Sequence, residues 1–168
     1  MSIIHWQFPG LDPTTAQQAG TAADPKVATT GQLFAYYHST YGWWTLRYVQ
    51  LKDAVTYAAG QVLTLAATDR TAVTNDVSGG SSLGLIFGGI GLMVYTQNYY
   101  GFVLVDGYYP TIKDNGDDDI AAGDGLIVAN SDGVCDSGTV ANTAFGNASA
   151  DDVNANNTVA GIVYLRGM

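Results

Sequence analysis

The most regular pattern in the chain is an alternation of residues that starts at Trp44. Trp44, Leu46 and Tyr48 fall on one face of an extended segment, and the residues between them fall on the other face. This period of two predicts a β-strand over residues 44–49. Short apolar runs bounded by residues typical of turns predict three more strands, at residues 62–65, 126–128 and 159–165.

Residues 99–128 read as strand, turn, strand, acidic loop, turn and strand. Residues 102–105 are apolar and favour β structure, and residues 108–112 supply a second extended run. Between them stands Asp106-Gly107, a dipeptide that readily reverses the chain between paired strands. The sequence therefore predicts a β-hairpin with its turn at Gly107.

Two short segments resemble each other in the way they open a strand. Ala58-Ala59-Gly60-Gln61 precedes the strand at 62–65, and Ala121-Ala122-Gly123-Asp124 precedes the strand at 126–128. Glycine accepts the positive φ that many turns require. We expect one turn structure to be used twice.

The glycine-rich apolar run at residues 83–95 raises the question of a membrane span. It is far shorter than the roughly twenty residues that a spanning helix needs. We interpret it as one or two buried strands with glycines at bulges, and we expect no membrane association. The flanking segment 68–82 and the later segment 143–158 are polar, and both are predicted to be loops.

Composition points in the same direction as the pattern. All fifteen acidic residues are Asp, and Asp favours turns whereas Glu favours helices. The predicted fold class is therefore all-β: a compact antiparallel β-sandwich or barrel with an extended N-terminal arm. Residues 1–42 are assigned to the arm and an aromatic lead-in, and residues 43–168 to the β-rich domain.

The arm begins with an apolar head on an otherwise polar segment. Ile3, Ile4, Trp6 and Phe8 would be poorly solvated unless they lay against protein. They are the residues expected to form a contact surface for another subunit. The alternative is that they cover the chain's own core.

Charge and cysteine content exclude several classes of function. The net charge is -9, and the six basic residues are scattered, so nucleic-acid binding is not expected. Cys135 is the only cysteine, which excludes an intramolecular disulfide and a thiolate-rich metal site. No cofactor is expected, and the first residues do not have the pattern of a secretory signal.

Two motifs could carry chemistry, and each has a simpler explanation. Asp114, Asp117 and Asp119 offer hard oxygen ligands for Ca²⁺, although the spacing departs from the twelve-residue calcium loop, and a solvated turn is the default. Ser82 stands in a Gly-x-Ser-x-Gly pattern that would need a strand-to-helix turn and a nearby His. His5 and His38 are the only histidines, and neither has a partner at ligand spacing.

Aromatic residues are dense between residues 34 and 48. Five of them, Tyr36, Tyr37, Tyr41, Trp43 and Trp44, could form a sugar-stacking platform or a protein-interface anchor, because aromatic rings give large contact areas at low entropic cost. A carbohydrate-binding module would use Tyr36, Tyr41, Trp43 or Tyr108 as its stacking face. The alternative for most of them is packing in the core.

The order of several segments resembles the capsid decoration, or cement, proteins of tailed bacteriophage heads and their head-associated relatives. The matching segments span roughly residues 43–168 and comprise residues 45–50, 58–60, 100–107, 120–126 and 160–166.

This resemblance implies a non-enzymatic virion protein on the capsid exterior, assembled in the host bacterial cytoplasm. Its expected partners are the phage major capsid protein and further copies of itself, often as trimers. Three alternatives stay open: a virion adhesion or carbohydrate-binding module, a tail or neck component, and, more remotely, a serine hydrolase using Ser82.

Overall fold

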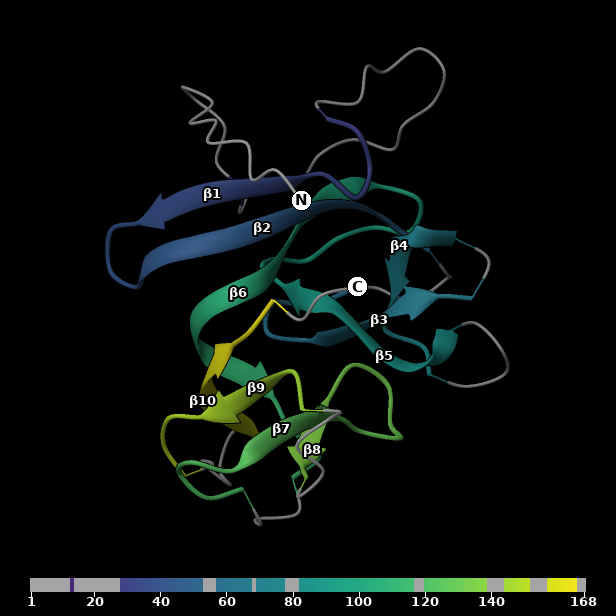
Figure 1. The fold of residues 1–168 in the computed structure, drawn as a ribbon. Helices are drawn as coiled ribbons and strands as arrows, with labels where there is room; N and C mark the ends of the chain where they lie inside the picture. Colours follow the sequence, from purple (N-terminus) through teal and green to yellow (C-terminus); the bar gives the residue numbers. More distant parts are fainter. Residues whose placement is uncertain are drawn as a thin grey trace.

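The computed structural model describes residues 13, 28–52, 57–67, 69–77, 82–116, 120–138, 144–151 and 157–165. Within these residues the chain forms ten strands and no helix, which confirms the predicted all-β class (Figure 1). No helix in the described part of the chain is long and apolar enough to cross a membrane. The expected arm, with Ile3, Ile4, Trp6 and Phe8, lies outside the described residues.

The strands are β1 (Leu33–His38), β2 (Gly42–Leu51), β3 (Val62–Ala66), β4 (Asp69–Thr74), β5 (Ser82–Gly91), β6 (Tyr100–Lys113), β7 (Gly125–Val128), β8 (Cys135–Ser137), β9 (Gly146–Ala148) and β10 (Thr158–Val163).

Five of these strands close into a small barrel. Their order is β2-β4-β3-β5-β6, and β6 pairs with β2 to complete the ring. β2 and β4 run parallel, whereas the other pairs in the ring are antiparallel, so the sheet is mixed rather than purely antiparallel. β1 extends the barrel as the antiparallel partner of β2.

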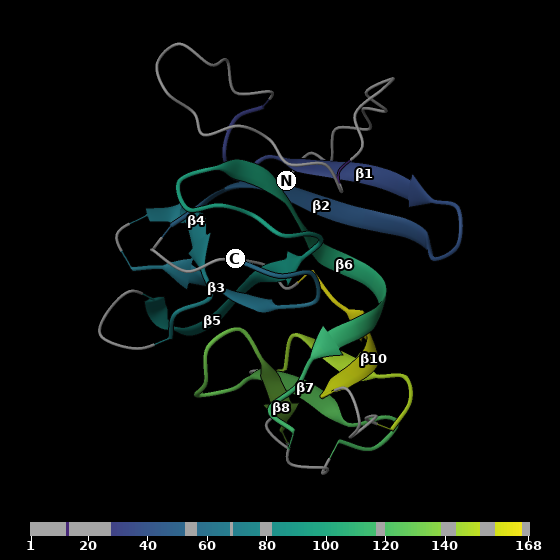
Figure 2. The same ribbon diagram turned by 180° about the vertical axis from the view of Figure 1, so that it is seen from behind.

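The long strand β6 joins the barrel to a second group of strands. Its first half pairs with β2, and its second half pairs with β10, which continues the sheet through β9 and β7 to β8. In Figures 1 and 2, β6 bends from the barrel toward this second group.

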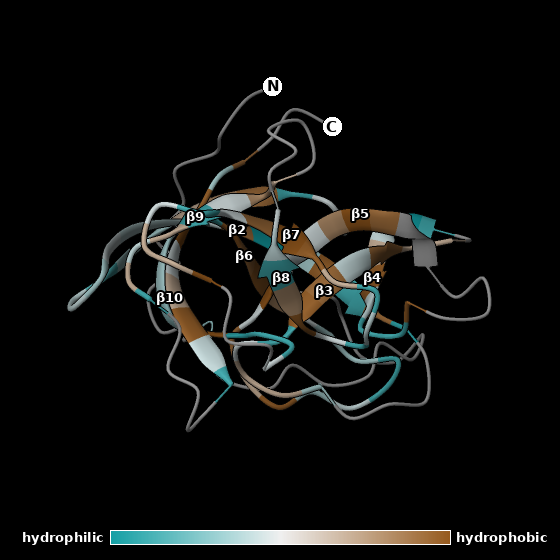
Figure 3. Ribbon diagram, turned by 90° about the horizontal axis from the view of Figure 1, so that it is seen from below, coloured by the Kyte–Doolittle hydropathy of each residue, from teal (hydrophilic) through white to brown (hydrophobic). Residues whose placement is uncertain are grey.

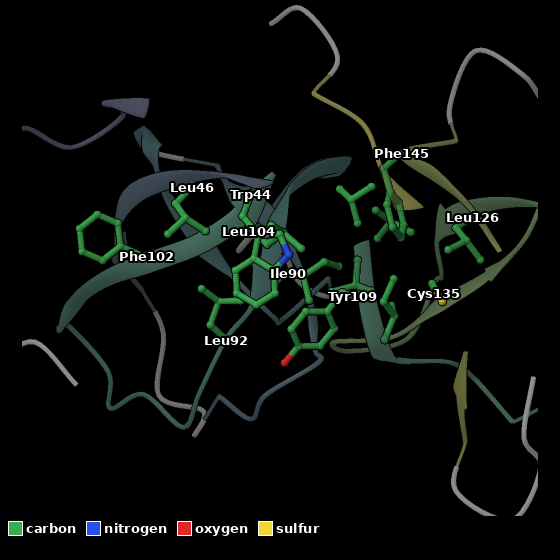
Figure 4. Packing of buried hydrophobic residues seen from close by; sticks show 14 of the residues in the cluster. Trp44, Leu46, Ile90, Leu92, Phe102, Leu104, Tyr109, Leu126, Cys135 and Phe145 are labelled. Carbon is green, nitrogen blue, oxygen red and sulfur yellow. The ribbon is translucent and has the colours of Figure 1, made fainter. Parts of the chain in front are cut away.

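Apolar residues on the two faces of β2 enter two different cores. Val49 and Leu51 belong to a cluster with residues of β3, β4 and β6, which fills the barrel. Trp44, Leu46 and Tyr48 belong to a larger cluster outside the barrel that also contains Leu126 and Phe145 from the second group of strands (Figure 4). Hydrophobic residues accordingly concentrate on the strands, as Figure 3 shows. The two faces that the alternation at 44–49 predicts therefore contact two different cores.

The predicted hairpin at Gly107 is wrong. β6 runs without reversal from Tyr100 to Lys113, and Gly107 is the position where its partner changes from β2 to β10. Gly107 has a φ of 123°. A Cβ at this position would lie 2.7 Å from Cδ1 of Trp44, so the glycine is needed for a close approach inside a strand rather than for a turn.

Three other predictions need correction. The segment 143–158, predicted to be a loop, contains β9 and the first residue of β10. The polar segment 68–82 contains β4, whose residues Ala72, Val73 and Thr74 are buried. β4 pairs with β2 and β3, and the buried Thr64 hydroxyl of β3 donates a hydrogen bond to the backbone oxygen of Thr74 at 3.3 Å. The glycine-rich run forms β5 with register shifts, as predicted, but Leu85 and Ile86 are exposed rather than buried.

The two similar turns are confirmed. Gln61 N donates to Ala58 O at 3.3 Å, and Asp124 N donates to Ala121 O at 3.0 Å. In each turn the last side chain reaches back to the first backbone amide: Ala58 N donates to Gln61 Oε1, and Ala121 N donates to Asp124 Oδ2. Both glycines have positive φ. The chain therefore uses one turn to enter both β3 and β7.

Candidate functional site

The β1–β2 hairpin carries the most exposed aromatic residues in the described part of the chain. It projects beyond the barrel at one side of the molecule (Figure 1). Trp43 is 63% exposed and Tyr37 is 53% exposed, whereas Trp44 is 3% exposed. Residues 33–38, assigned above to the arm and lead-in, form strand β1 of the sheet.

Tyr37 and Trp43 face each other across the two strands. They are register partners, and their ring centroids are 5.3 Å apart with an interplanar angle of 66°. Cross-strand aromatic pairs of this kind stabilise a hairpin while their outer surfaces stay accessible. We call these two residues the exposed pair.

The barrel explains why two large aromatic residues stand in solvent. Along β2, Trp43 lies on the same face as Val49 and Leu51, because side chains alternate with a period of two. That face is covered inside the barrel, where Val49 and Leu51 are fully buried. The hairpin continues past the barrel, so the same face of β2 is uncovered at Trp43.

The opposite face of the hairpin is packed. Trp44 lies within 6.1 Å, between ring centroids, of Tyr36, His38, Tyr41 and Tyr109. Its indole Nε1 donates a hydrogen bond to the backbone oxygen of Tyr108 at 2.9 Å, which satisfies its one polar atom. Trp44 therefore fixes the hairpin to β6, and the exposed pair is presented from a rigid support.

His38 fixes the tip of the hairpin. Its Nδ1 accepts hydrogen bonds from the backbone N–H groups of Thr40 at 3.1 Å and Tyr41 at 3.2 Å. These two bonds close the turn between β1 and β2. His38 also stacks on Tyr41, with centroids 4.5 Å apart. These contacts give His38 a structural role in the turn.

The hairpin lies in a segment without acidic residues. No Asp occurs between Asp24 and Asp53, although the whole chain has fifteen. Within this segment Arg47 is buried, and its Nη2 donates to the backbone oxygen of Arg70 at 2.7 Å. Burial lowers the pKa of Arg47, and the nearby carboxylate of Asp69 offsets part of that effect. The exposed pair therefore projects from a stretch of sequence without acidic residues, and Asp106 of β6 is the register partner of Thr45 beside it.

Among the aromatic residues that the sequence suggested for a stacking face or an interface anchor, Tyr37 and Trp43 are strongly exposed, whereas Trp44 is buried. Tyr36, Tyr41 and Tyr108 are partly buried, and Tyr41 packs against Tyr108 with centroids 5.6 Å apart. The pairing of Tyr37 with Trp43 was not predicted, because the sequence pattern predicts no strand at residues 33–38.

The predicted calcium site is described only in part. Asp114 is buried, and its Oδ1 accepts a hydrogen bond from Gly116 N at 2.7 Å, which forms a turn within the chain. Asp117 and Asp119 lie outside the described residues. In the described part of the chain, no group of three or more His, Cys, Asp or Glu residues is arranged to hold a metal ion.

Two further residues lack the surroundings that their chemistry would need. Ser82 begins strand β5 and pairs with Ala66, so a strand follows it where the nucleophile motif needs a helix. Cys135 is buried, and burial raises the pKa of its thiol, with a smaller contribution from Asp114. A thiol in this state is a weak nucleophile.

Comparison with known proteins adds no assignment. No protein-family model matches the sequence, and no curated protein has significant sequence similarity to it.

Proposed function

We propose that this protein is a structural virion component that binds the outer surface of a phage capsid and stabilises it. The observation that carries the proposal is the exposed pair on a rigid, projecting hairpin. Tyr and Trp are the residues that most often supply binding energy at protein interfaces, because they bury large areas and lose little side-chain entropy. The sequence resemblance to capsid decoration proteins supplies the class of partner.

The proposed contacts come from two parts of the chain. The hairpin supplies the exposed pair, and the N-terminal head supplies Ile3, Ile4, Trp6 and Phe8. Many weak contacts repeated on a capsid lattice sum to strong attachment through avidity. The proposed partners are the major capsid protein and other copies of this chain.

Binding to empty capsids tests the proposal. Purified protein is mixed with expanded empty capsids of the phage, and bound copies are counted after sedimentation. We expect saturable binding with a fixed number of copies per capsid. Deletion of residues 1–10 is expected to lower the occupancy at a given protein concentration. Absence of binding by the full chain would contradict the proposed function, and unchanged occupancy after the deletion would contradict the role of the arm.

A carbohydrate-binding module is the second candidate, and the exposed pair also favours it. Aromatic ring faces stack on sugar rings, and Trp43 offers such a face to solvent. Titration with oligosaccharides would separate the two functions. Quenching of Trp43 fluorescence by a sugar, abolished in Trp43→Phe and retained in Trp44→Phe, would support glycan binding over capsid binding.

A further inference from the structure

The segment that follows β6 contains the single Asn-Gly dipeptide of the sequence, Asn115-Gly116. Asparagine is chemically labile in proteins, and a following glycine has no side chain to hinder attack by its own backbone nitrogen. Gly116 has a φ of 80°, which glycine adopts without strain. The dipeptide stands at the end of the strand that joins the barrel to the second group of strands.

Deamidation at this dipeptide would proceed through a five-membered ring. The backbone nitrogen of Gly116 attacks Cγ of Asn115, so that an N–Cγ bond forms and the Cγ–Nδ2 bond breaks. The side-chain nitrogen leaves as ammonia and takes the proton that Gly116 N has lost. One water molecule then opens the succinimide ring at either carbonyl, which gives Asp or isoAsp. The reaction consumes one water molecule, releases one ammonia molecule and needs no oxidant or cofactor.

The structure holds this segment by three consecutive backbone N–H groups. Asp114 N donates to Asn157 O at 3.1 Å, and Asn115 N donates to Cys135 O at 3.1 Å. Gly116 N, the atom that would attack, donates to Oδ1 of Asp114 at 2.7 Å. The dipeptide is thus tied to the segments that lead into β10 and β8, and its nucleophilic nitrogen is already engaged.

Asp114 is placed to prevent the attack. An N–H group has to give up its hydrogen bond before its nitrogen can attack a carbonyl carbon. Asp114 is 4% exposed, and its own backbone N–H is bonded to Asn157, so the acceptor of the Gly116 N–H is held in position. The cyclisation therefore requires the end of β6 to open first.

We propose that Asn115 is a deamidation site that the fold keeps unreactive, and that Asp114 is the residue that protects it. Opening of a strand end costs less free energy than global unfolding, so the reaction reports on local opening. IsoAsp adds one carbon atom to the main chain, and the longer chain cannot restore all three hydrogen bonds. The modification would therefore keep this end of β6 open. It is independent of capsid binding, because it concerns the purified protein alone.

Deamidation of the full chain in native buffer and in urea tests this protection. Trypsin cleavage after Lys113 leaves Asn115 and Asn130 in one peptide, and mass spectrometry follows the two sites separately. Asn130 is exposed and precedes Ser131, so it is the internal control. In urea we expect Asn115 to react faster than Asn130, because glycine hinders the attack least. On folding, the rate at Asn115 is expected to fall by a factor at least about tenfold larger than the factor at Asn130.

Two outcomes of this comparison would overturn the proposal. A rate at Asn115 no faster than at Asn130 in urea would show that the dipeptide is not a preferred deamidation site. Equal slowing of both residues on folding would show that the fold gives Asn115 no particular protection.

Variants of Asp114 test the protecting residue. Asp114→Ala removes the acceptor and is expected to raise the native rate at Asn115, relative to Asn130, by about tenfold or more. Asp114→Asn keeps a side-chain oxygen that can accept the Gly116 N–H, so its rate is expected to rise less. If Asp114→Ala fails to fold, the comparison in native buffer and urea decides. An unchanged or slower rate at Asn115 in folded Asp114→Ala would overturn the role of Asp114.

Discussion

Trp43 and Trp44 are neighbours in the sequence with opposite environments. Trp43 is 63% exposed and contacts Tyr37 across the hairpin, whereas Trp44 is 3% exposed and packs among four rings of the core. The difference arises because β2 alternates its faces and continues past the barrel. Trp44 therefore stabilises the hairpin, and Trp43 is left available for a partner.

The largest expected effect is at Trp44. Trp44→Ala should lower the free energy of unfolding by about 3–5 kcal/mol, because it removes a buried ring and leaves a cavity. It also removes the hydrogen bond to Tyr108 O. Denaturant unfolding measures this change, and Trp44→Phe should restore part of the loss. A loss below about 1 kcal/mol in Trp44→Ala would contradict the supporting role of Trp44.

Substitutions at two glycines can distinguish the cost of a close contact from the cost of backbone strain alone. Gly107→Ala should cost roughly 2–4 kcal/mol, because the new Cβ would meet Trp44 and the backbone has positive φ. Gly123→Ala is the matched control, since its φ is also positive but no atom lies within 4 Å of the added Cβ. We expect the control to cost about 1 kcal/mol in denaturant unfolding. Equal losses would show that contact with Trp44 does not explain the need for Gly107.

Tyr109 packs on the buried side beside Trp44. It should make the free energy of unfolding decrease at alkaline pH. Burial raises the pKa of Tyr109, and the neighbouring Tyr41 raises it further. The folded state then holds the phenol proton more tightly than the unfolded state. Its contribution to stability is present below the unfolded pKa of about 10 and is lost as the pH rises above it.

The free energy of unfolding measured on both sides of about pH 10 checks this expectation. Tyr109→Phe should lose less stability at alkaline pH than the unmodified protein. Some loss should persist, because burial also raises the pKa of Tyr95. The same loss in both proteins would show that Tyr109 does not contribute.

Much of the fold could be predicted from local patterns. The alternation at residues 44–49 predicts a strand with two distinct faces, and the two Ala-Ala-Gly segments predict the repeated turn. Each of these features depends on residues close together in sequence. Local patterns were sufficient for these features because strand alternation and turn hydrogen bonds both involve residues that are neighbours in sequence.

The failures involve contacts between distant segments. Asp106-Gly107 has the composition of a hairpin turn, but Trp44 occupies the space beside Gly107 and β10 pairs with the continuing strand. β4 is polar in sequence and depends on its neighbours in the sheet. The sequence suggested Trp43 as one of several aromatic residues for an exposed face. It could not show that Trp43 is exposed and Trp44 buried, because that depends on where the barrel ends.

The smallest expected effect on stability is at Trp43, and it accompanies the largest expected effect on binding. Trp43→Ala should change the free energy of unfolding by less than about 1 kcal/mol, because the ring is mostly exposed. Capsid occupancy as a function of protein concentration tests most directly whether this exposed ring binds a partner. We predict about 30-fold weaker binding for Trp43→Ala, corresponding to an interface anchor worth about 2 kcal/mol. Unchanged affinity in a folded Trp43→Ala protein would contradict the role of the hairpin in binding.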